Sequence, residues 1–345
     1  FKNIRKVEWT NRGEWECSRQ SPMKTLTDIT SYTDYVDQLK LFFEGESLDD
    51  IEAVETVYPQ YDKAKFLESV YIDEKSYNTL VSLVETKKNV ILQGAPGVGK
   101  TFAAKRLAYS MMGVKDPNRV MLIQFHQSYS YEDFIMGFRP SENGFELKHG
   151  VFYNFCKMAE IDSDNAYFFI IDEINRGNLS KIFGELFMLL ESDKRGVELQ
   201  LLYADEKFSI PENVHIIGMM NTADRSLAML DYALRRRFAF YELEPAFESN
   251  GFKDYERKLN NGKFDKLIEC VKKLNLIIKK DETLGTGFCL GHSYFCELDK
   301  VEDDNLDLAL ARIVEFELIP LLKEYWFDDT DMVIEWSNNL RSAIQ

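Results

Sequence analysis

Residues 89–101 constrain the fold of this chain more than any other stretch. They read NVILQGAPGVGKT, and the last eight of them fit the pattern G-x-x-x-x-G-K-[ST] at every fixed position. The apolar run predicts a short strand, the glycines predict a tight turn, and residues 102–108 are compatible with a helix. In such a unit the backbone N–H groups of the turn and the positive end of the helix dipole point at one spot. The sequence therefore predicts a loop that binds phosphate.

The predicted nucleotide contacts are centred on this loop, residues 94–101, which we call the phosphate loop. Gly94 and Gly99 are expected to take backbone angles that a Cβ would forbid. Lys100 can reach the β- and γ-phosphates of a nucleotide, and the Thr101 hydroxyl can ligate Mg²⁺. A chance glycine turn is the alternative, and the strand before the loop and the helix after it argue against that. The predicted nucleotide-binding residues are Gly94, Ala95, Pro96, Gly97, Val98, Gly99, Lys100, Thr101, Phe102 and Asp172.

A second apolar run brings an acidic pair. Residues 167–171 show no alternation of polar and apolar side chains, which suits a central parallel strand covered on both faces. The run ends in Asp172 and Glu173. Asp172 can hold Mg²⁺ opposite Thr101, so these two are the predicted metal residues. Glu173 can orient or deprotonate an attacking water. Two acids after a strand can also simply begin a turn, but their combination with a phosphate loop favours the catalytic interpretation.

Two further stretches add polar groups to the predicted site. Residues 214–219 form an apolar strand that runs into Asn221, and the carboxyl edge of an open α/β sheet is where ligands bind. Residues 231–238 read DYALRRRF. Three adjacent arginines usually form a solvated helix end, but beside a nucleotide site an arginine supplied across a subunit boundary is the better interpretation. The predicted catalytic residues are Glu173, Asn221, Arg236 and Arg237.

Composition narrows the class of protein. The chain has 345 residues, 45% of them hydrophobic, which allows a sizeable core and about two or three domains. A net charge of −16 argues against a protein whose whole surface grips nucleic acid. Five cysteines without a C-x-x-C pair suggest thiols in a reducing compartment, and no apolar run is long enough to span a membrane, so we expect a cytoplasmic protein. Because the chain begins with Phe1 rather than Met, we expect a fragment that lacks an N-terminal domain.

The remaining pattern predicts an α/β part followed by a helical part. A further strand is expected at 120–125, and hairpins at 138–148, around Asn143–Gly144, and at 197–210. Helices are expected at 66–88, 180–190, 264–280, 306–326 and 331–344, with Pro320 kinking the fourth. The predicted domains are an N-terminal remnant and linker at 1–65, an α/β nucleotide-binding part with a parallel sheet flanked by helices at 66–246, and a small helical part at 247–345.

Three stretches, together with the phosphate loop, carry a family resemblance. Residues 171–178 (IDEINRGN), 220–226 (MNTADRS) and 291–295 (GHSYF) resemble AAA+ proteins, and more narrowly the McrB family of GTP-hydrolysing motors from modified-cytosine-dependent restriction systems. The resemblance implies an AAA+ P-loop core with a helical lid, and a homo-hexameric ring with Mg²⁺ and GTP between subunits. It also implies a McrC-like endonuclease partner and DNA with modified-cytosine sites, read by the missing N-terminal domain.

The resemblance implies roles for individual residues as well. Asn221 would be the polar sensor near the γ-phosphate, and Arg236 and Arg237 would fall at the arginine finger and its neighbour. His292 would lie on the lid side of the site, without an assigned role. Both hairpins would point toward the ring pore, and residues 4–9 are similar to the closing strand of an EVE-type modified-base reader. The residues implied at the subunit boundary are Asn175, Arg176, Asp224 and Arg225.

Alternatives stay open at this point. Residues 221–224 superficially match the guanine-reading motif N-K-x-D, but they lack its Lys and follow the sensor strand, so the motif does not establish guanine selectivity. GTP is therefore what the resemblance implies, and ATP is the alternative. A MoxR-like ATPase that remodels protein complexes would have the same fold and site. A nucleotide-gated binding module without turnover is a third hypothesis, against which Glu173 and the arginine triplet argue.

Overall fold

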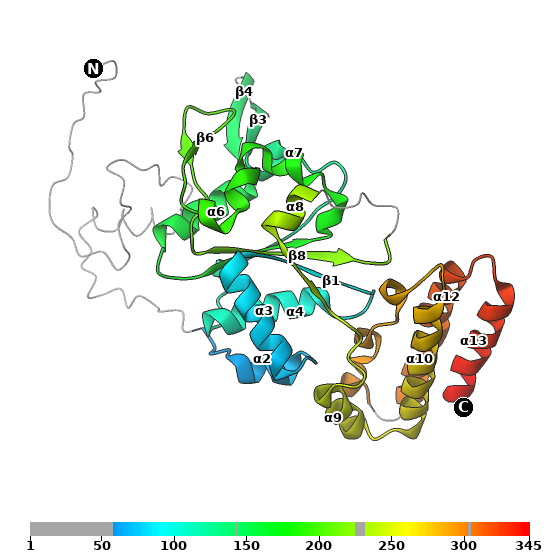
Figure 1. Ribbon diagram of the computed structural model, residues 1–345. Coiled ribbons are helices and arrows are strands. Elements are labelled where there is room, and N and C mark those ends of the chain that lie inside the picture. Colours follow the sequence, from blue (N-terminus) through cyan, green and yellow to red (C-terminus); the bar gives the residue numbers. More distant parts are fainter. Residues whose placement is uncertain (1–57, 142–143, 225–231, 303–304) are drawn as a thin grey trace, which may run out of the picture.

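A five-stranded sheet forms the centre of the molecule (Figure 1). The structure, a computed structural model, describes residues 58–141, 144–224, 232–302 and 305–345. The strand order is β2-β5-β8-β1-β9, and all neighbours pair in parallel, which confirms the predicted parallel sheet. The strands are β1 Asn89–Gly94, β2 Val120–Gln124, β5 Tyr167–Asp172, β8 Val214–Asn221 and β9 Ala239–Glu242. The carboxyl ends of β1, β5 and β8 therefore meet at one edge of the sheet.

Alternate side chains of the central strands supply two separate hydrophobic cores. In β5, Phe168 lies in one core and the next residue, Phe169, lies in the other. Burial on both faces explains why the central strands read as continuous apolar runs. Helices cover both faces, with α3 Glu74–Lys87 and α4 Lys100–Met112 on the first and α6 Val151–Ile161 on the second.

The approach to the phosphate loop differs from the prediction. Instead of one helix over 66–88, there are two helices, α2 Lys63–Ser69 and α3, with extended backbone between them. Asp73 caps α3, because its carboxylate accepts a hydrogen bond from the Ser76 N–H at 2.7 Å. The single helix was therefore wrong, since Asp73 begins a new one. After the phosphate loop, α4 ends at Gly113, which has φ +75° as a glycine C-cap should.

Both predicted β-hairpins are present. β3 Met136–Ser141 pairs with β4 Gly144–His149, and β6 Leu199–Gln200 pairs with β7 Lys207–Phe208. The β3–β4 hairpin follows the short helix α5 Tyr131–Phe134 and projects from the sheet near β6 (Figure 1). An edge-to-face contact between Phe138 and Tyr203, with ring centroids 6.0 Å apart, joins the two hairpins.

The segment after β5 is less regular than predicted. The helix expected at 180–190 is wrong in its length, because α7 Leu179–Phe183 ends at Gly184. Gly184 has φ +53°, and a Cβ there would lie 2.8 Å from the Tyr131 ring, so the chain changes direction at a residue that has to be glycine. The remaining short helical turns of the sheet domain are η2 Pro117–Arg119, η3 Ile174–Arg176, η4 Gly184–Leu190 and η5 Ser192–Lys194.

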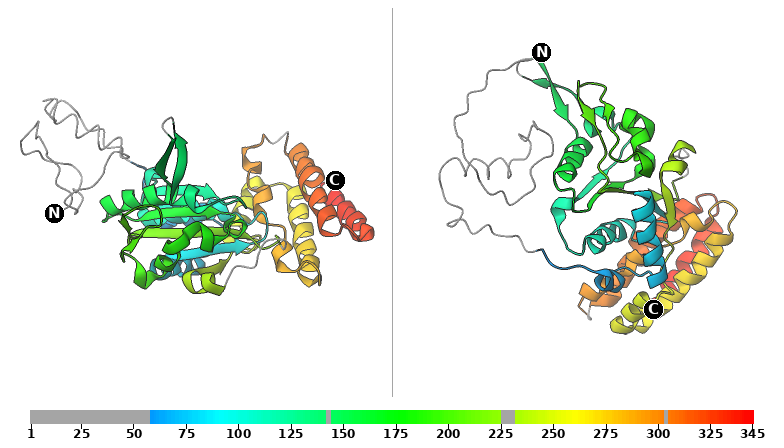
Figure 2. Two further views of the ribbon diagram at one scale, coloured as in Figure 1. Left: turned by 90° about the horizontal axis from the view of Figure 1, so that it is seen from above. Right: turned by 60° about the vertical axis from the view of Figure 1, so that its left-hand side comes forward.

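The last part of the chain is helical, as predicted, and stands beside the sheet domain (Figure 2). Strand β9 and helix α9 were missed by the sequence analysis. The helix expected at 306–326 contains the π-helical turn η10 Val314–Leu318 just before Pro320, a residue that has no N–H to donate to the helix. The helices from α8 onward are α8 Tyr232–Arg237, α9 Asn250–Leu259, α10 Gly262–Lys280, η6 Thr286–Phe288, η7 His292–Phe295, η8 Leu298–Lys300, α11 Leu306–Ile313, α12 Ile319–Tyr325 and α13 Thr330–Ala343.

Some predictions fall on residues that the structure does not describe. These are the strand at 4–9, the remnant and linker up to residue 57, and Arg225. Within the described residues, every helix is too short or too polar to cross a lipid bilayer.

Candidate nucleotide-binding site

The phosphate loop has the backbone geometry of an anion cradle. Gly97 and Gly99 have φ values of +75° and +76°, and Gly99 is the N-cap of α4, so the loop delivers its N–H groups to the start of that helix. The sequence analysis expected Gly94 to take a backbone angle that a Cβ forbids, and this reason was wrong. Its φ is not positive, but a Cβ there would lie 2.4 Å from the Leu243 carbonyl oxygen. Gly94 is therefore set by the close approach of the chain that follows β9.

Lys100 is held inside this cradle. Its Nζ donates hydrogen bonds to the carbonyl oxygens of Gly94 and Ala95, both at 2.9 Å, and the side chain is buried. Burial lowers the pKa of Lys100 to about 8, although the nearby carboxylates of Glu173 and Asp172 oppose the shift. Those carboxylates belong to the end of β5, so the structure brings the acidic pair next to the phosphate loop as predicted.

Glu173 is fixed in position by its backbone and by two partners. Its φ of +51° is uncommon for a residue with a Cβ and turns the chain sharply after β5. Asn221 at the end of β8 donates from Nδ2 to Glu173 Oε1 at 2.9 Å, and Arg176 donates from Nε to Oε2 at 3.1 Å. The parallel pairing of β5 with β8 explains this meeting, because it places the carboxyl ends of the two strands side by side. The pairing of Gly94 with Asn221 across β1 and β8 also brings Asn221 level with the phosphate loop.

The residues implied at a subunit boundary are placed differently from one another. Arg176 has a partly exposed side chain and also donates to Asp224 Oδ2 at 2.9 Å, which makes a chain of charges from Glu173 to Asp224. Asn175 is buried, and its Oδ1 has no hydrogen-bond partner among the described residues. A contact of Asn175 with a second subunit would therefore need the surrounding loop to open.

The two candidate arginines at the end of α8 differ in the same way. Arg236 is exposed. Arg237 is half-buried, with its NH2 3.0 Å from Glu191 Oε1 and its guanidinium 4.4 Å from the centre of the Phe187 ring. Arg237 is thus engaged within its own chain, whereas Arg236 is presented to the outside.

The lid contacts the phosphate loop directly, which the sequence analysis missed. The N–H of Gly291 donates to the Pro96 carbonyl at 3.1 Å, and the N–H of Ser293 donates to the Gly97 carbonyl at 2.8 Å. A Cβ on Gly291 would lie 2.0 Å from the Gly97 backbone, and Tyr294 packs against Gly97 from the lid side. The stretch GHSYF was a signal, but nothing in its spacing pointed to the loop it touches. We call residues 291–294 the lid loop.

His292 occupies the centre of this contact. Its Nδ1 accepts a hydrogen bond from the Ala246 N–H at 3.1 Å, and its ring lies among Tyr71, Phe247 and Phe252. Burial lowers the pKa of His292 to about 4, so the ring is neutral near pH 7. A structural role as the junction between the lid and the sheet domain follows from these contacts.

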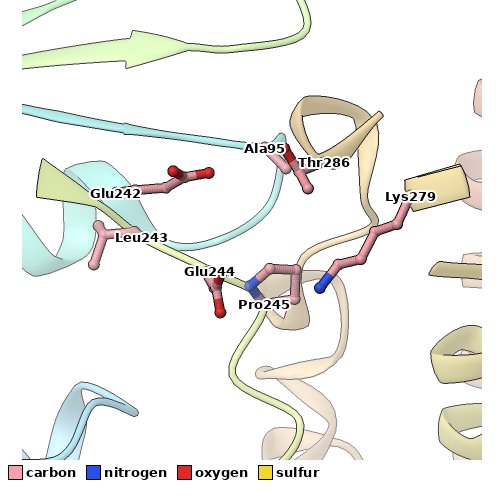
Figure 3. A pocket seen from close by; sticks show the side chains of 7 residues that line it. All are labelled: Ala95, Glu242, Leu243, Glu244, Pro245, Lys279 and Thr286. Atoms are coloured by element: carbon pink, nitrogen blue, oxygen red, sulfur yellow. The ribbon is translucent and has the colours of Figure 1, made fainter. Parts of the chain in front are cut away.

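A small pocket lies between Ala95 of the phosphate loop, the chain that leaves β9 and the lid. Figure 3 shows Thr286 of η6 beside Ala95, and Lys279 of α10 extending toward Pro245. Close by, the Thr222 hydroxyl donates to the Gly287 carbonyl at 3.2 Å. The lid therefore reaches both the phosphate loop and the chain just after β8.

The arrangement fits a magnesium–nucleotide complex. Gly97 and Gly99, with their positive φ values, turn the backbone of the phosphate loop toward the start of α4, and Thr101 is exposed on the first turn of that helix. Hydroxyl and carboxylate oxygens, here from Thr101 and Asp172, are the ligands that Mg²⁺ prefers. The exposed ring of Phe102, which stacks on Arg106, stands next to Thr101.

Comparisons with known proteins agree with this geometry. Residues 89–238 match the AAA domain family of the dynein-related subfamily, and residues 266–333 match the McrB alpha-helical lid domain. The chain is 50% identical over 284 residues to the type IV methyl-directed restriction enzyme EcoKMcrB subunit of Escherichia coli K12, covering 79% of this chain and 61% of that protein. It is 27% identical over 197 residues to the type II restriction enzyme BsuMI component YdiS of Bacillus subtilis 168, covering 46% and 57%.

The chain spans about three fifths of the length of the curated relatives it matches. A solved structure of a putative ATPase from Cytophaga hutchinsonii covers 70% of this chain and 77% of its own, at 16% identity and a TM-score of 0.34, an overlap too low to support an inference.

The phosphate loop, the parallel sheet and the helical lid together define an AAA+ nucleoside triphosphatase domain. The match of the helical part to the McrB lid domain identifies the type of AAA+ domain more narrowly. The chain carries a McrB-like AAA+ domain followed by a McrB lid, which confirms the family resemblance seen in the sequence.

Proposed function

We propose that this chain is the GTP-hydrolysing motor part of a McrBC-like, modification-dependent restriction endonuclease. The observation that carries the proposal is the meeting of Lys100, Glu173 and Asn221 at one edge of the sheet, in a domain closed by a McrB lid. The 50% identity to a subunit of a methyl-directed restriction enzyme supports a role in a restriction system. In this proposal, residues 66–246 and 247–345 are the large and lid parts of the motor, and residues 1–65 belong to a reader domain and linker.

The positions of the side chains support the following catalytic roles. The phosphate loop and Lys100 would bind the triphosphate, and Thr101 and Asp172 would hold Mg²⁺, whose charge would offset that of the phosphates. Glu173 takes the proton of the attacking water, and Asn221 holds the Glu173 carboxylate in place for that step. The Nε–H of Arg176 occupies one acceptor position on the second Glu173 carboxylate oxygen, which can accept a further hydrogen bond.

We further propose a homo-hexameric ring in which each subunit completes the site of its neighbour. An arginine that stabilises transition-state charge from a second subunit has to be exposed, and Arg236 meets this condition better than Arg237. The partners in this proposal are a McrC-like endonuclease subunit and DNA with modified-cytosine sites.

Two substitutions test the catalytic roles. Glu173→Gln should bind nucleotide but hydrolyse it at least about 100-fold more slowly, because general-base catalysis contributes factors of about 10²–10⁴. Arg236→Ala should bind nucleotide normally and lose on the order of 10³-fold or more in turnover. Nucleotide affinity and steady-state turnover are measured on the same preparations. Wild-type turnover in either variant would remove that residue from the proposed mechanism.

The choice of nucleotide and system needs a separate assay. Turnover is measured with GTP and with ATP, each with and without a McrC-like protein. A preference for GTP and stimulation by that partner are expected. Equal or faster turnover of ATP, with no response to the partner, would instead favour a MoxR-like remodelling ATPase.

A further inference from the structure

A buried polar cluster lies at the amino end of the sheet, opposite the nucleotide site. Asn89, the first residue of β1, is completely buried. Its Nδ2 donates to the carbonyl oxygens of Leu190, at 2.5 Å, and Arg237, at 2.9 Å. Its Oδ1 accepts from Arg195 NH2 at 2.5 Å. One amide side chain thus joins three segments that are far apart in the sequence.

The buried guanidinium of Arg195 fixes the orientation of the Asn89 side-chain amide. Arg195 makes its hydrogen bond to Asn89, and its Nε and NH1 are buried with no partner among the described residues. The group stays charged near neutral pH, because burial lowers the pKa of Arg195 only to about 10. A charged donor that is fixed on Asn89 Oδ1 determines how the amide is oriented, so both N–H groups of Asn89 point at the two carbonyls.

One of those carbonyls belongs to the helix that carries the candidate finger. Arg237 is the last residue of α8, and carbonyl groups at a helix C-terminus lack partners within the helix. Asn89 supplies that partner. On the side-chain side, Glu191 pairs with the Arg237 guanidinium, and Glu191 directly follows Leu190, the other residue that Asn89 holds. The main chain of Arg237 is therefore fixed to Asn89, which also holds Leu190, and its side chain is fixed to Glu191, the next residue.

We propose that Asn89 is a positioning residue for Arg236: it fixes the end of α8, so that the exposed arginine one residue earlier points at the nucleotide of the next subunit. Arg237 is the anchor in this scheme and Arg236 the finger. This inference rests on the proposed ring with an arginine acting across the boundary. A direct consequence is that Asn89, although it lies in the strand leading to its own phosphate loop, acts mainly on the site of the neighbour.

The test separates a defect in the nucleotide site of the mutated subunit from a defect in the arginine that this subunit supplies to its neighbour. Asn89→Asp keeps the shape of the side chain and the acceptor for Arg195 but removes both N–H donors. We expect nucleotide affinity and KM within about threefold of wild type and kcat at least about tenfold lower, a fraction of what a missing finger costs. Asn89→Ala is the second variant, with the same expected pattern.

Mixing experiments give the decisive readout. Lys100→Ala has a dead site but an intact finger, so adding it to Asn89→Asp should restore hydrolysis, whereas adding Arg236→Ala should not. The matched control is Asn275→Asp, another buried asparagine, whose side chain holds Leu290 just before the lid loop. Its defect lies on the lid of its own site, so Lys100→Ala should not rescue it.

Each outcome bears on one of the two proposals. Wild-type kcat in Asn89→Asp, or a loss that Lys100→Ala does not restore, would overturn the positioning role. Wild-type turnover in Arg236→Ala, or no recovery in its mixture with Lys100→Ala, would overturn the ring mechanism itself, whatever Asn89 does.

Discussion

The contact between the lid and the phosphate loop makes the stability of the protein depend on pH in a defined way. The buried His292 has a pKa of about 4 in the folded protein, against an ordinary value of 6.5. Between these pH values the unfolded chain binds a proton that the folded chain does not. The free energy of unfolding therefore falls as the pH drops from above 6.5 toward 4.

The size of the effect follows from the two pKa values. At pH 5 the loss relative to pH 8 is about 2 kcal/mol for one such histidine. His215 is a second case, because burial lowers its pKa to about 4 as well, with the nearby positive charge of Lys88 adding to the shift. The two histidines together should cost about 4 kcal/mol at pH 5.

Replacing His292 by Asn should remove its contribution to the pH dependence of the free energy of unfolding. Urea unfolding of wild type and His292→Asn, followed by tryptophan fluorescence, is measured at pH 8 and at pH 5. The variant should lose about 2 kcal/mol less than wild type between the two pH values, whatever its stability at pH 8. His126→Asn, at an exposed ring, is the matched substitution for the loss of a histidine as such.

An unchanged pH dependence in His292→Asn would refute the reasoning. It would mean that the His292 ring is solvated in the folded protein, and hence that the lid loop does not rest on the phosphate loop in solution. The nucleotide-site geometry built from the Gly291 and Ser293 contacts would then be wrong.

Two further predictions concern the same region. Gly291→Ala should weaken nucleotide binding at least about tenfold and leave the sheet domain folded, because the added Cβ would meet the Gly97 backbone at 2.0 Å, where neither chain can give way easily. Gly262→Ala, where a Cβ meets nothing within 4 Å, is the control, and equal affinities in calorimetry would contradict the prediction. Nucleotide binding at pH 8 should take up roughly half a proton, because Lys100 has a pKa of about 8 before it meets the phosphates and is fully protonated afterwards. Calorimetry in buffers of different ionisation enthalpy measures this uptake, and no uptake at pH 8 would contradict the assigned pKa.

Local pattern determined much of the fold and part of the site. The phosphate loop, the apolar strands and both hairpins follow from glycines, apolar runs and turn residues that are close in the sequence. The errors also have local causes that a periodicity argument overlooks. Asp73 begins a second helix before the loop, and Gly184 ends α7. The edge strand β9 has four residues, too few to show a period of its own.

The distinction between the two candidate arginines was not available from the sequence. Arg236 and Arg237 are adjacent and chemically identical, and only their partners differ. Glu191 and Phe187 lie more than forty residues earlier in the chain, so no local rule could assign them to Arg237. The same holds for Asn89, which reads as an ordinary polar residue before a strand and turns out to hold the end of α8.

The sequence by itself predicted a loop that binds phosphate within a McrB-like AAA+ domain, because a phosphate cradle is made by neighbouring residues. Only the tertiary structure decided why Gly94 and Gly291 have to be glycine, where His292 lies and which arginine is exposed. These depend on approaches between segments that are distant along the chain, and side-chain periodicity carries no record of such distances.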